Sequence, residues 1–405
     1  MPRPTPFHSR TSALCTSQSW QEWSGFLSAT TYEIDHIHEY NAVRTSCAVF
    51  DVSPLYKYQV RGRDAQALLN RVVTRDVSKC RVGQVMYTAW CDDDGKVIDD
   101  GTLARLGDDF FRLTAAIPTL YWLQDNAAGL DVEIEDASDA SGALSLQGPT
   151  SRDLLQNICD ADLGSLRYFR LVETKVAGVA ARVSRTGYTG DLGYEIFVDP
   201  GDAERLWDAT LDTGRAYGLQ AAGNLALDMV RIEAGLLLID VDFVSARQTL
   251  FEVQRSSPYE LGLGWMVKLD KDFFVGREAL RREQARGPVW TTVGIVVDVD
   301  ALEEAFARFR MPLHLPYTSW NTAVPVYADM DRQHHIGKAT SGTWSPILKS
   351  YVAICRVEPS HGELGRQVYL EETVEGQRFA IPAKIVEMPF FDPPRKKALE
   401  ASIGT

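Results

Sequence analysis

The chain has 405 residues, with 42 Lys and Arg against 55 Asp and Glu, so its formal net charge at pH 7 is −13. This acidic balance argues against a protein that binds nucleic acid or an anionic membrane, because both need a basic surface. Hydrophobic residues make up 45% and charged residues 24%, which is the usual composition of a folded globular protein. The length predicts roughly two to four domains, and an enzyme is the expected class.

Six cysteines are dispersed along the chain and none forms a C-x-x-C pair, so neither a structural zinc site nor a dithiol redox motif is expected. The N-terminus has no apolar stretch long enough for a signal peptide, and the longest aliphatic run, Leu236–Ile239, is far too short to cross a bilayer. We therefore expect a cytoplasmic protein. The close pairs His36 with His38 and His334 with His335 lack a nearby third ligand, so we expect no bound metal.

In the first half of the chain, strands arrive in hairpins rather than in regular βαβ units. Residues 1–30 are rich in Ser, Thr and Pro and are expected to form a loosely packed lead-in. A helix running into a short strand is expected over 32–51, and apolar residues at helical spacing predict a helix over 64–73. The acidic turn Asp92–Gly95 indicates a hairpin. Strands are predicted over 56–62, 84–90, 96–106, 110–115, 131–136 and 142–148.

The second half changes character after Arg286-Gly287. Before this point, a β-rich block over 172–198 is followed by amphipathic helices over 203–218 and 224–235. Beyond it, short strands separated by Gly, Pro and Ser predict an all-β sandwich or barrel over about 288–395. The hairpin order of the first 280 residues predicts an α+β fold class.

Two features carry acidic side chains of interest. Asp99 and Asp100 are adjacent in one predicted strand, so alternation sends them to opposite faces and at most one belongs to a given pocket. Glu195 shares its strand face with Phe197, and a buried carboxylate there needs a donor partner. For both features a solvated strand end or edge is an equal alternative. Arg231 lies near the end of a predicted helix. It is a candidate to bind a substrate carboxylate or to pair with Glu195. Alternatively, it is a C-terminal basic residue that interacts favourably with the helix dipole.

Taken in order, short motifs from about Cys47 to Phe391 resemble the aminomethyltransferase (glycine-cleavage T-protein) family of tetrahydrofolate enzymes. The ordered set is specific for the superfamily and less specific for the substrate. The matching segments are Phe50–Ser53, Val77–Gln84, Tyr87-Thr88, Gly95–Asp100, Leu146–Pro149, Arg185–Gly190, Gly193–Glu195, Arg231–Gly235, Leu261–Lys271, Phe274–Leu280, Thr340–Pro346 and Pro389-Phe390.

The resemblance implies three subdomains in a cloverleaf around a central hole that holds tetrahydrofolate. It places a discontinuous folate-binding α+β subdomain at 1–60 and 140–280, a second α+β subdomain at 61–139, and a barrel-like all-β subdomain at 281–405. By the same resemblance, Glu195 accepts hydrogen bonds from the two-amino group and ring N–H of the pterin. The other cofactor-binding positions that it implies are Tyr87, Tyr188, Arg231 and Trp265.

For the chemical step, the resemblance puts Asp100 beside the reacting nitrogens of folate, with Asp99 as its neighbour. An acid there takes the proton released at N5 or steadies positive charge during transfer. Asp100 ranks first, because its spacing from Tyr87 fits the family better.

The donor site departs from the T-protein pattern. Pro54-Leu55 stands where His-Met is typical, and Leu236–Phe243 replaces the usual segment after the helix glycine. These changes favour a small methylated donor: a sulfonium, quaternary ammonium, N-methyl or aryl methyl ether compound. Asp240 and Asp242 are candidates to attract a cationic donor, although solvated loop residues are the simpler alternative. Tyr56, Tyr58 and Phe243 are candidates for a cation–π contact with it.

The leading hypothesis is therefore a tetrahydrofolate-dependent methyltransferase, a demethylase that moves a one-carbon group from a small methylated donor to N5. One alternative is a glycine-cleavage aminomethyltransferase acting on aminomethyl-lipoyl H-protein. The other is a folate-binding protein without turnover, which is disfavoured because Arg185–Gly190 lacks the cysteine of those relatives. Neither a redox cofactor nor a metal is expected.

Overall fold

The computed structural model describes residues 1–399 and divides them into two compact units. The first comprises Met1–Trp90, Asp99–Val230 and the chain from Asp392 onward. The second comprises Cys91–Ile98 and Arg231–Phe391.

A six-stranded sheet forms most of the core of the first unit. Its strands are β3 (Cys47–Asp51), β9 (Gly142–Gln147), β10 (Leu171–Val176), β11 (Val179–Ser184), β12 (Gly193–Val198) and β13 (Leu219–Ala221). They lie in the order β10-β11-β12-β9-β3-β13, and β13 is parallel to β3 whereas the other pairs are antiparallel. This sheet places β12, which carries Glu195, in its interior.

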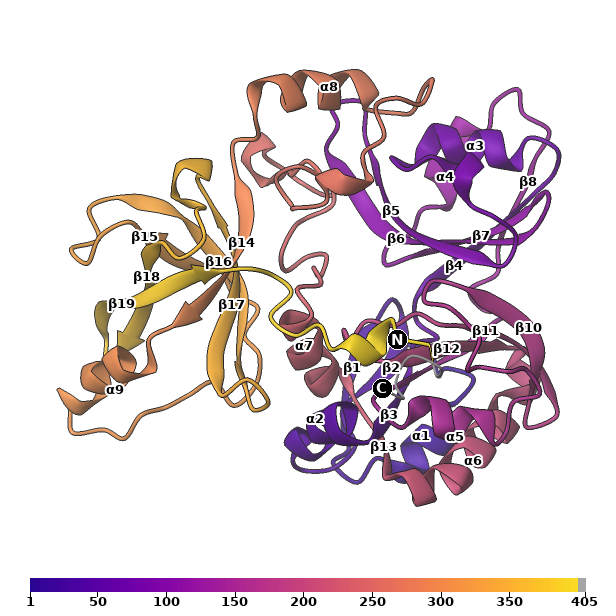
Figure 1. Ribbon diagram of the computed structural model, residues 1–405, viewed down its shortest axis with the longest axis horizontal. Helices are drawn as coiled ribbons and strands as arrows, with labels where there is room; N and C mark the ends of the chain where they lie inside the picture. Colours follow the sequence, from indigo (N-terminus) through magenta and orange to yellow (C-terminus); the bar gives the residue numbers. More distant parts are fainter. Residues whose placement is uncertain (400–405) are drawn as a thin grey trace. The chain divides into compact units, whose positions relative to one another are not determined.

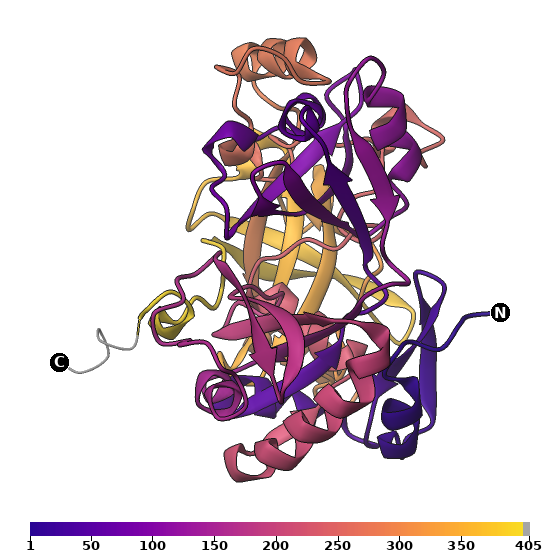
Figure 2. The ribbon, with the colours of Figure 1, turned by 90° about the vertical axis from the view of Figure 1, so that its right-hand side faces the viewer.

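Helices complete the core around this sheet. They are α1 (His8–Leu14), α2 (His36–Thr45), α5 (Ser151–Gln156), α6 (Ala203–Gly214) and α7 (Asn224–Glu233). Helix α6 buries Leu206, Trp207 and Thr210, whose spacing puts them on one helical face. Leu206 and Trp207 belong to the same buried cluster as Ile196 of the sheet, and Figure 2 shows α6 running along the sheet.

The N-terminal segment is ordered, so the expectation of a loosely packed lead-in was wrong. Besides α1 it forms a hairpin of β1 (Ser19–Trp23) and β2 (Phe26–Thr31). Phe7 and Cys15 are fully buried, and the ring of Phe7 lies 6.1 Å from that of Trp207. A few apolar anchors therefore hold a segment whose average composition is polar.

A five-stranded sheet belongs to the first unit except for the tip of one hairpin, Cys91–Ile98, which belongs to the second. Its strands are β4 (Tyr56–Arg61), β5 (Gln84–Cys91), β6 (Val97–Gly107), β7 (Phe110–Ala115) and β8 (Glu133–Asp136), in the order β5-β6-β7-β4-β8. Helices α3 (Ala65–Val72) and α4 (Leu120–Asn126) lie together beside it (Figure 1). The expected acidic turn is present between β5 and β6, where Gly95 has the positive φ of 73° that a glycine tolerates.

A closed six-stranded barrel forms the core of the second unit (Figure 1). Its strands are β14 (Thr291–Val297), β15 (Val324–Tyr327), β16 (His335–Ser345), β17 (Ser350–Val357), β18 (Gln367–Val374) and β19 (Gln377–Val386). Helix α9 (Val299–Ala307) packs Leu302 and Phe306 against the barrel core, and α8 (Arg277–Arg286) precedes the first strand. The α+β class and the barrel-like C-terminal region are thus confirmed.

Within the described part of the chain, seven short 3-10 turns connect these elements: η1 (Val77–Lys79), η2 (Pro200–Asp202), η3 (Arg215–Tyr217), η4 (Glu252–Gln254), η5 (Gly264–Met266), η6 (Pro359–His361) and η7 (Pro394–Lys396). All six cysteines are buried free thiols. Among residues 1–399, none of the helices combines the length and the apolar character that crossing a membrane requires.

Candidate functional site

One face of the five-stranded sheet carries a row of polar side chains. Lys57 of β4 lies opposite Thr114 of β7, and Thr114 lies opposite Thr102 of β6. Residues paired across strands share a face, and side chains alternate along each strand. Asp100 and Arg112, each two residues before one of these threonines, therefore lie on that same face.

Tyr87 and Asp100 form a hydrogen-bonded pair on this face. The Tyr87 hydroxyl donates to Asp100 Oδ2 over 2.5 Å. Burial, together with the charge of Asp100, raises the pKa of Tyr87 well above its ordinary value, so the phenol stays a proton donor at neutral pH. Tyr188 also raises the pKa of Tyr87 electrostatically, which brings the three predicted residues into one neighbourhood.

Asp99 points to the other face, as alternation requires. Its carboxylate accepts hydrogen bonds from the backbone N–H groups of Asp100 (2.8 Å), Ala116 (2.9 Å) and Ile117 (3.1 Å). Burial and the neighbouring Asp100 raise the pKa of Asp99, and these three N–H groups oppose the rise. Asp99 thus ties β6 to the end of β7, which suits a framework role.

Glu195 is partly buried in β12 and has the donor that a buried carboxylate requires. The Thr186 hydroxyl donates to Glu195 Oε2 over 2.5 Å. Burial raises the pKa of Glu195, while Thr186 and the positive charges of Arg112 and Lys57 act against that rise. The Arg112 guanidinium lies 3.5 Å from the centre of the Phe197 ring, so β7 of one sheet meets β12 of the other here.

A buried glutamine positions the loop before Glu195. Gln147 Nε2 donates to the carbonyl of Thr186 over 3.1 Å, and its Oε1 accepts from the Thr189 hydroxyl over 2.8 Å. A Cβ atom at Gly187 or at Gly193 would lie 2.1 Å from Gln147 Oε1, so a larger residue at either position would displace the Gln147 side chain from its hydrogen bonds. The glycines of this segment therefore serve close packing around Gln147, which holds both Thr186 and the loop that carries Tyr188.

Two buried polar groups on this face of β7 lack hydrogen-bonded partners. Arg112 Nε and Thr114 Oγ1 make no hydrogen bond within the described chain, although Arg112 is only 6% exposed and Thr114 only 8%. Lys57, in contrast, donates to the carbonyls of Ser53 and Leu55, each over 2.7 Å. Burial lowers the pKa of Lys57 to about 7 and that of Arg112 to about 10.

In the second unit, the carboxylate paired with Arg231 is Asp242. Both side chains are almost fully buried, and Arg231 Nη1 donates to Asp242 Oδ2. The same oxygen accepts from the backbone N–H of Leu238, while Oδ1 accepts from the hydroxyls of Thr340 and Ser341. Both oxygens of Asp242 are therefore engaged within the protein rather than offered to a cationic donor.

The other predicted positions have varied surroundings. Asp240 is exposed and has a left-handed φ of 65°, whereas Phe243 is buried. Trp265 lies in η5 with 55% of its surface exposed. In the first unit, the rings of Tyr56 and Tyr58 stack in parallel with their centres 6.2 Å apart. The predicted donor residues are therefore divided between the two units.

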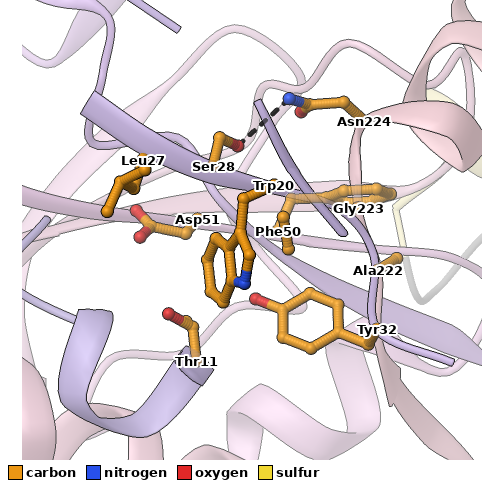
Figure 3. Close-up of a pocket in the computed structure, with 11 residues that line it drawn as sticks. Thr11, Trp20, Leu27, Ser28, Tyr32, Phe50, Asp51, Ala222, Gly223 and Asn224 are labelled. Atoms are coloured by element: carbon orange, nitrogen blue, oxygen red, sulfur yellow. Dashed lines mark hydrogen bonds between the residues drawn. The ribbon is translucent and has the colours of Figure 1, made fainter. Parts of the chain in front are cut away.

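Two cavities lie away from these residues. The first, of about 10 Å³, is enclosed by Trp20, Tyr32, Asp51 and their neighbours (Figure 3), and it is large enough for about one water molecule. The second, of about 320 Å³, lies in the second unit and is lined by Trp320, Tyr351 and barrel residues. Within residues 1–399, no three or more His, Cys, Asp or Glu side chains are grouped to hold a metal ion.

Two family models match the chain. The GCVT N-terminal domain matches residues 7–271, and the glycine cleavage T-protein C-terminal barrel domain matches residues 318–392. The chain belongs to the glycine-cleavage T-protein family. This membership confirms the resemblance inferred from the motifs. It also confirms the expected enzyme class, a folate-dependent one-carbon transferase, and the expected cofactor, tetrahydrofolate.

Two relatives illustrate the range within the T-protein family. A trimethylamine-oxide aldolase of Ruegeria pomeroyi is 34% identical over 98% of this chain, which spans only 48% of that longer protein. An aminomethyltransferase of Thermoanaerobacter is 33% identical over 82% of this chain and 84% of its own length. The fold is that of the glycine cleavage system aminomethyltransferase T from Bartonella henselae, with a TM-score of 0.81 at 22% identity over 97% of this chain and 99% of that one.

Sequence reasoning did not single out Arg112, Thr114 or Gln147. A signal for Arg112 was present, because it is the one charged residue in the mostly apolar strand FFRLTA. A charge in the middle of a buried strand needs a partner or a function. The role of Gln147 carried no such signal, because the glycines packed around it are 40 and 46 residues further along the chain.

Proposed function

We propose that the protein transfers a methyl group from a small methylated donor to N5 of tetrahydrofolate. The observation that carries this proposal is the hydrogen bond from Tyr87 to Asp100 on the polar face that also presents Arg112 toward Glu195. The face combines a positioned acid for proton transfer with buried groups that suit a polar ring. Both requirements follow from methylation of a ring nitrogen.

The residues of the first unit fit a pterin. A pterin presents a two-amino group and a neighbouring ring N–H, and a carboxylate accepts both hydrogen bonds at once. Glu195 has one oxygen engaged by Thr186, and a carboxylate has acceptor capacity for further donors. Tyr188, close to the Tyr87–Asp100 pair, supplies an aromatic side chain for packing against the cofactor.

Tetrahydrofolate supplies N5, the nitrogen that receives the one-carbon group. Asp100 takes the proton that N5 loses when the new N–C bond forms, and the electron pair of the broken bond stays with the donor heteroatom. Tyr87 orients the Asp100 carboxylate and stabilises its charged form through their hydrogen bond. Thr186 holds Glu195 and so fixes the cofactor against Asp100.

Two considerations favour a small donor. The relative named trimethylamine-oxide aldolase, whose name denotes an N-methyl compound, is similar over 98% of this chain. The positions expected near the donor also differ from the T-protein pattern, at Pro54-Leu55 and across Leu236–Phe243. Similarity to aminomethyltransferases over 82% of the chain favours the second candidate, transfer from the aminomethyl-lipoyl group of H-protein.

Product analysis separates the candidates. The protein is incubated with tetrahydrofolate and, separately, sulfonium, quaternary ammonium, N-methyl and aryl methyl ether donors, and the folate product is identified by mass. We expect 5-methyltetrahydrofolate with one of these donors. Methylenetetrahydrofolate formed only with aminomethyl-loaded H-protein would establish the second candidate instead. Methylenetetrahydrofolate from a small donor would show transfer at the oxidation level of formaldehyde. Binding of tetrahydrofolate without any product would show that the protein does not catalyse the transfer.

A further inference from the structure

Arg112 is a buried cation without a hydrogen-bonded acceptor. It lies between the fully buried Phe111 and Leu113 in β7, and its Nε is buried without a hydrogen-bonded partner within residues 1–399. Removing a guanidinium from water costs several kcal/mol unless hydrogen bonds replace its hydration. Stacking on Phe197 offsets part of this cost but satisfies no N–H group. The unused donors therefore indicate an acceptor that comes from a ligand.

The charges around Arg112 define what it faces. Glu195 is the carboxylate that acts on it, and Arg182 is a second cation nearby. Arg112 and Glu195 influence each other electrostatically, yet no hydrogen bond or ion pair joins them. Glu195 accepts from Thr186 instead. The carboxylate acceptor of Glu195 and the guanidinium donor of Arg112 thus lie in the same region of the first unit without bonding to each other.

Thr114 adds a second unused donor on the same strand face. Its hydroxyl is buried without a hydrogen-bonded partner, and it lies two residues from Arg112, so both side chains extend from the same side of β7. Of the neighbouring polar groups, Lys57 is already bonded to two backbone carbonyls. Arg112 and Thr114 are therefore the groups left to meet an acceptor opposite Glu195.

A ligand that satisfies both Glu195 and the Arg112–Thr114 pair carries hydrogen-bond donors next to an acceptor along one edge. The pyrimidine ring of a pterin has this order: the two-amino group, the ring N–H and then the 4-oxo oxygen. We propose that Arg112, assisted by Thr114, binds the 4-oxo oxygen while Glu195 binds the adjacent donors, so that the protein selects 4-oxo over 4-amino pterins. This inference rests on folate binding in the proposed function and does not depend on the methyl donor.

The test compares two cofactors that differ at one position. Dissociation constants of tetrahydrofolate and of tetrahydroaminopterin, its 4-amino counterpart, are measured by calorimetry for the full chain without any donor. We expect the wild-type protein to bind the 4-oxo compound more tightly. Equal affinities, or no binding of tetrahydrofolate, would overturn the inference without reference to any variant.

Variants then assign the preference to Arg112. Because a hydrogen bond to a charged group contributes about 1.5–3 kcal/mol, Arg112→Met should weaken tetrahydrofolate binding roughly 10- to 100-fold. It should change binding of the 4-amino compound little, so that the preference narrows to the part that comes from Glu195 and the ring N–H, which the 4-amino compound lacks. Thr114→Val should weaken only the 4-oxo compound, by roughly 2- to 10-fold. Arg112→Lys keeps the charge and should give an intermediate preference.

The matched control is Arg182→Met, which removes the neighbouring cation. Arg182 is partly exposed and paired with Glu173, so the preference for the 4-oxo compound should survive. Circular dichroism checks that each variant is folded. If Arg112→Met weakened both cofactors equally, the arginine would act through general electrostatics or folding, and the inference would be wrong. If the preference for the 4-oxo compound depends on Arg112 but no donor yields 5-methyltetrahydrofolate, only the proposed methyl transfer is overturned.

Discussion

Replacing Asp242 with asparagine tests whether the second unit uses this acid for its framework or for the donor. The carboxylate accepts four hydrogen bonds, from Arg231, the Leu238 N–H and the hydroxyls of Thr340 and Ser341. The asparagine side chain has the same shape, but it loses the charge and turns one acceptor atom into a donor. Arg231, with a side chain 1% exposed, would then lose the negative charge of this carboxylate from its buried surroundings.

Removing one partner of a buried pair destabilises by about 3–5 kcal/mol, and Asp242→Asn should fall in this range. The matched control is Asp240→Asn, two residues away, where the side chain is exposed and the expected change is within about 0.5 kcal/mol. Both values come from urea unfolding of the full chain followed by tryptophan fluorescence. Each resolved transition is fitted separately, because the chain has two compact units.

Donor affinity is measured on the same two variants under native conditions. The structure predicts that Asp242→Asn lowers stability and leaves the donor affinity of the folded protein unchanged. A loss of stability below about 1 kcal/mol, well short of the range for a broken buried pair, would refute the framework role. So would weakened donor binding with wild-type stability, which would restore Asp242 as a donor-binding residue.

Three further predictions concern the first unit. Asp100→Asn should lower kcat by roughly 10²- to 10⁴-fold and change tetrahydrofolate affinity far less. Steady-state kinetics and calorimetry measure the two quantities, and equal losses in both would contradict a role in proton transfer. Glu195→Gln should weaken tetrahydrofolate binding roughly 10-fold or more without altering the urea midpoint, and unchanged affinity would exclude it as the pterin acceptor. Burial lowers the pKa of Lys57 from 10.5 to about 7, so between these pH values the folded state binds fewer protons than the unfolded chain and stability rises with pH. Lys57→Met should flatten that rise in urea unfolding, whereas parallel pH profiles of variant and wild type would contradict it.

Local patterns were sufficient to predict most of the framework. The acidic turn at Asp92–Gly95 and the alternation around it predicted the β5–β6 hairpin, because turn chemistry and period-two burial act over a few residues. The same alternation predicted that Asp99 and Asp100 face opposite ways, and their hydrogen bonds follow it. An all-β sandwich or barrel was predicted for the C-terminal region for the same reason, since its strands are short and separated by Gly, Pro and Ser.

Interactions between distant segments escaped prediction. Arg231 was matched with Glu195 as one alternative, but the structure pairs it with Asp242, within a loop whose conformation the helix pattern did not specify. Arg112 and Glu195 are 83 positions apart in the sequence, and only the packing of β7 against β12 shows that a buried guanidinium stacks beside the carboxylate. Periodicity predicts which face of a strand is buried, but not what lies opposite that face.

The balance of charges around Arg112 and Glu195 explains why a neutral ring suits this region better than an ion. Arg112 and Glu195 contribute opposite charges, and Lys57, with a pKa of about 7, carries at most part of a charge at neutral pH. An anionic ligand would compete with Glu195, and a cationic donor would be repelled by Arg112, so each would leave one buried charge poorly compensated. A neutral edge with donors beside an acceptor compensates both at once. The overall charge of −13 therefore says little about this site, whose proposed selectivity rests on the separation of the buried Arg112 from the partly buried Glu195.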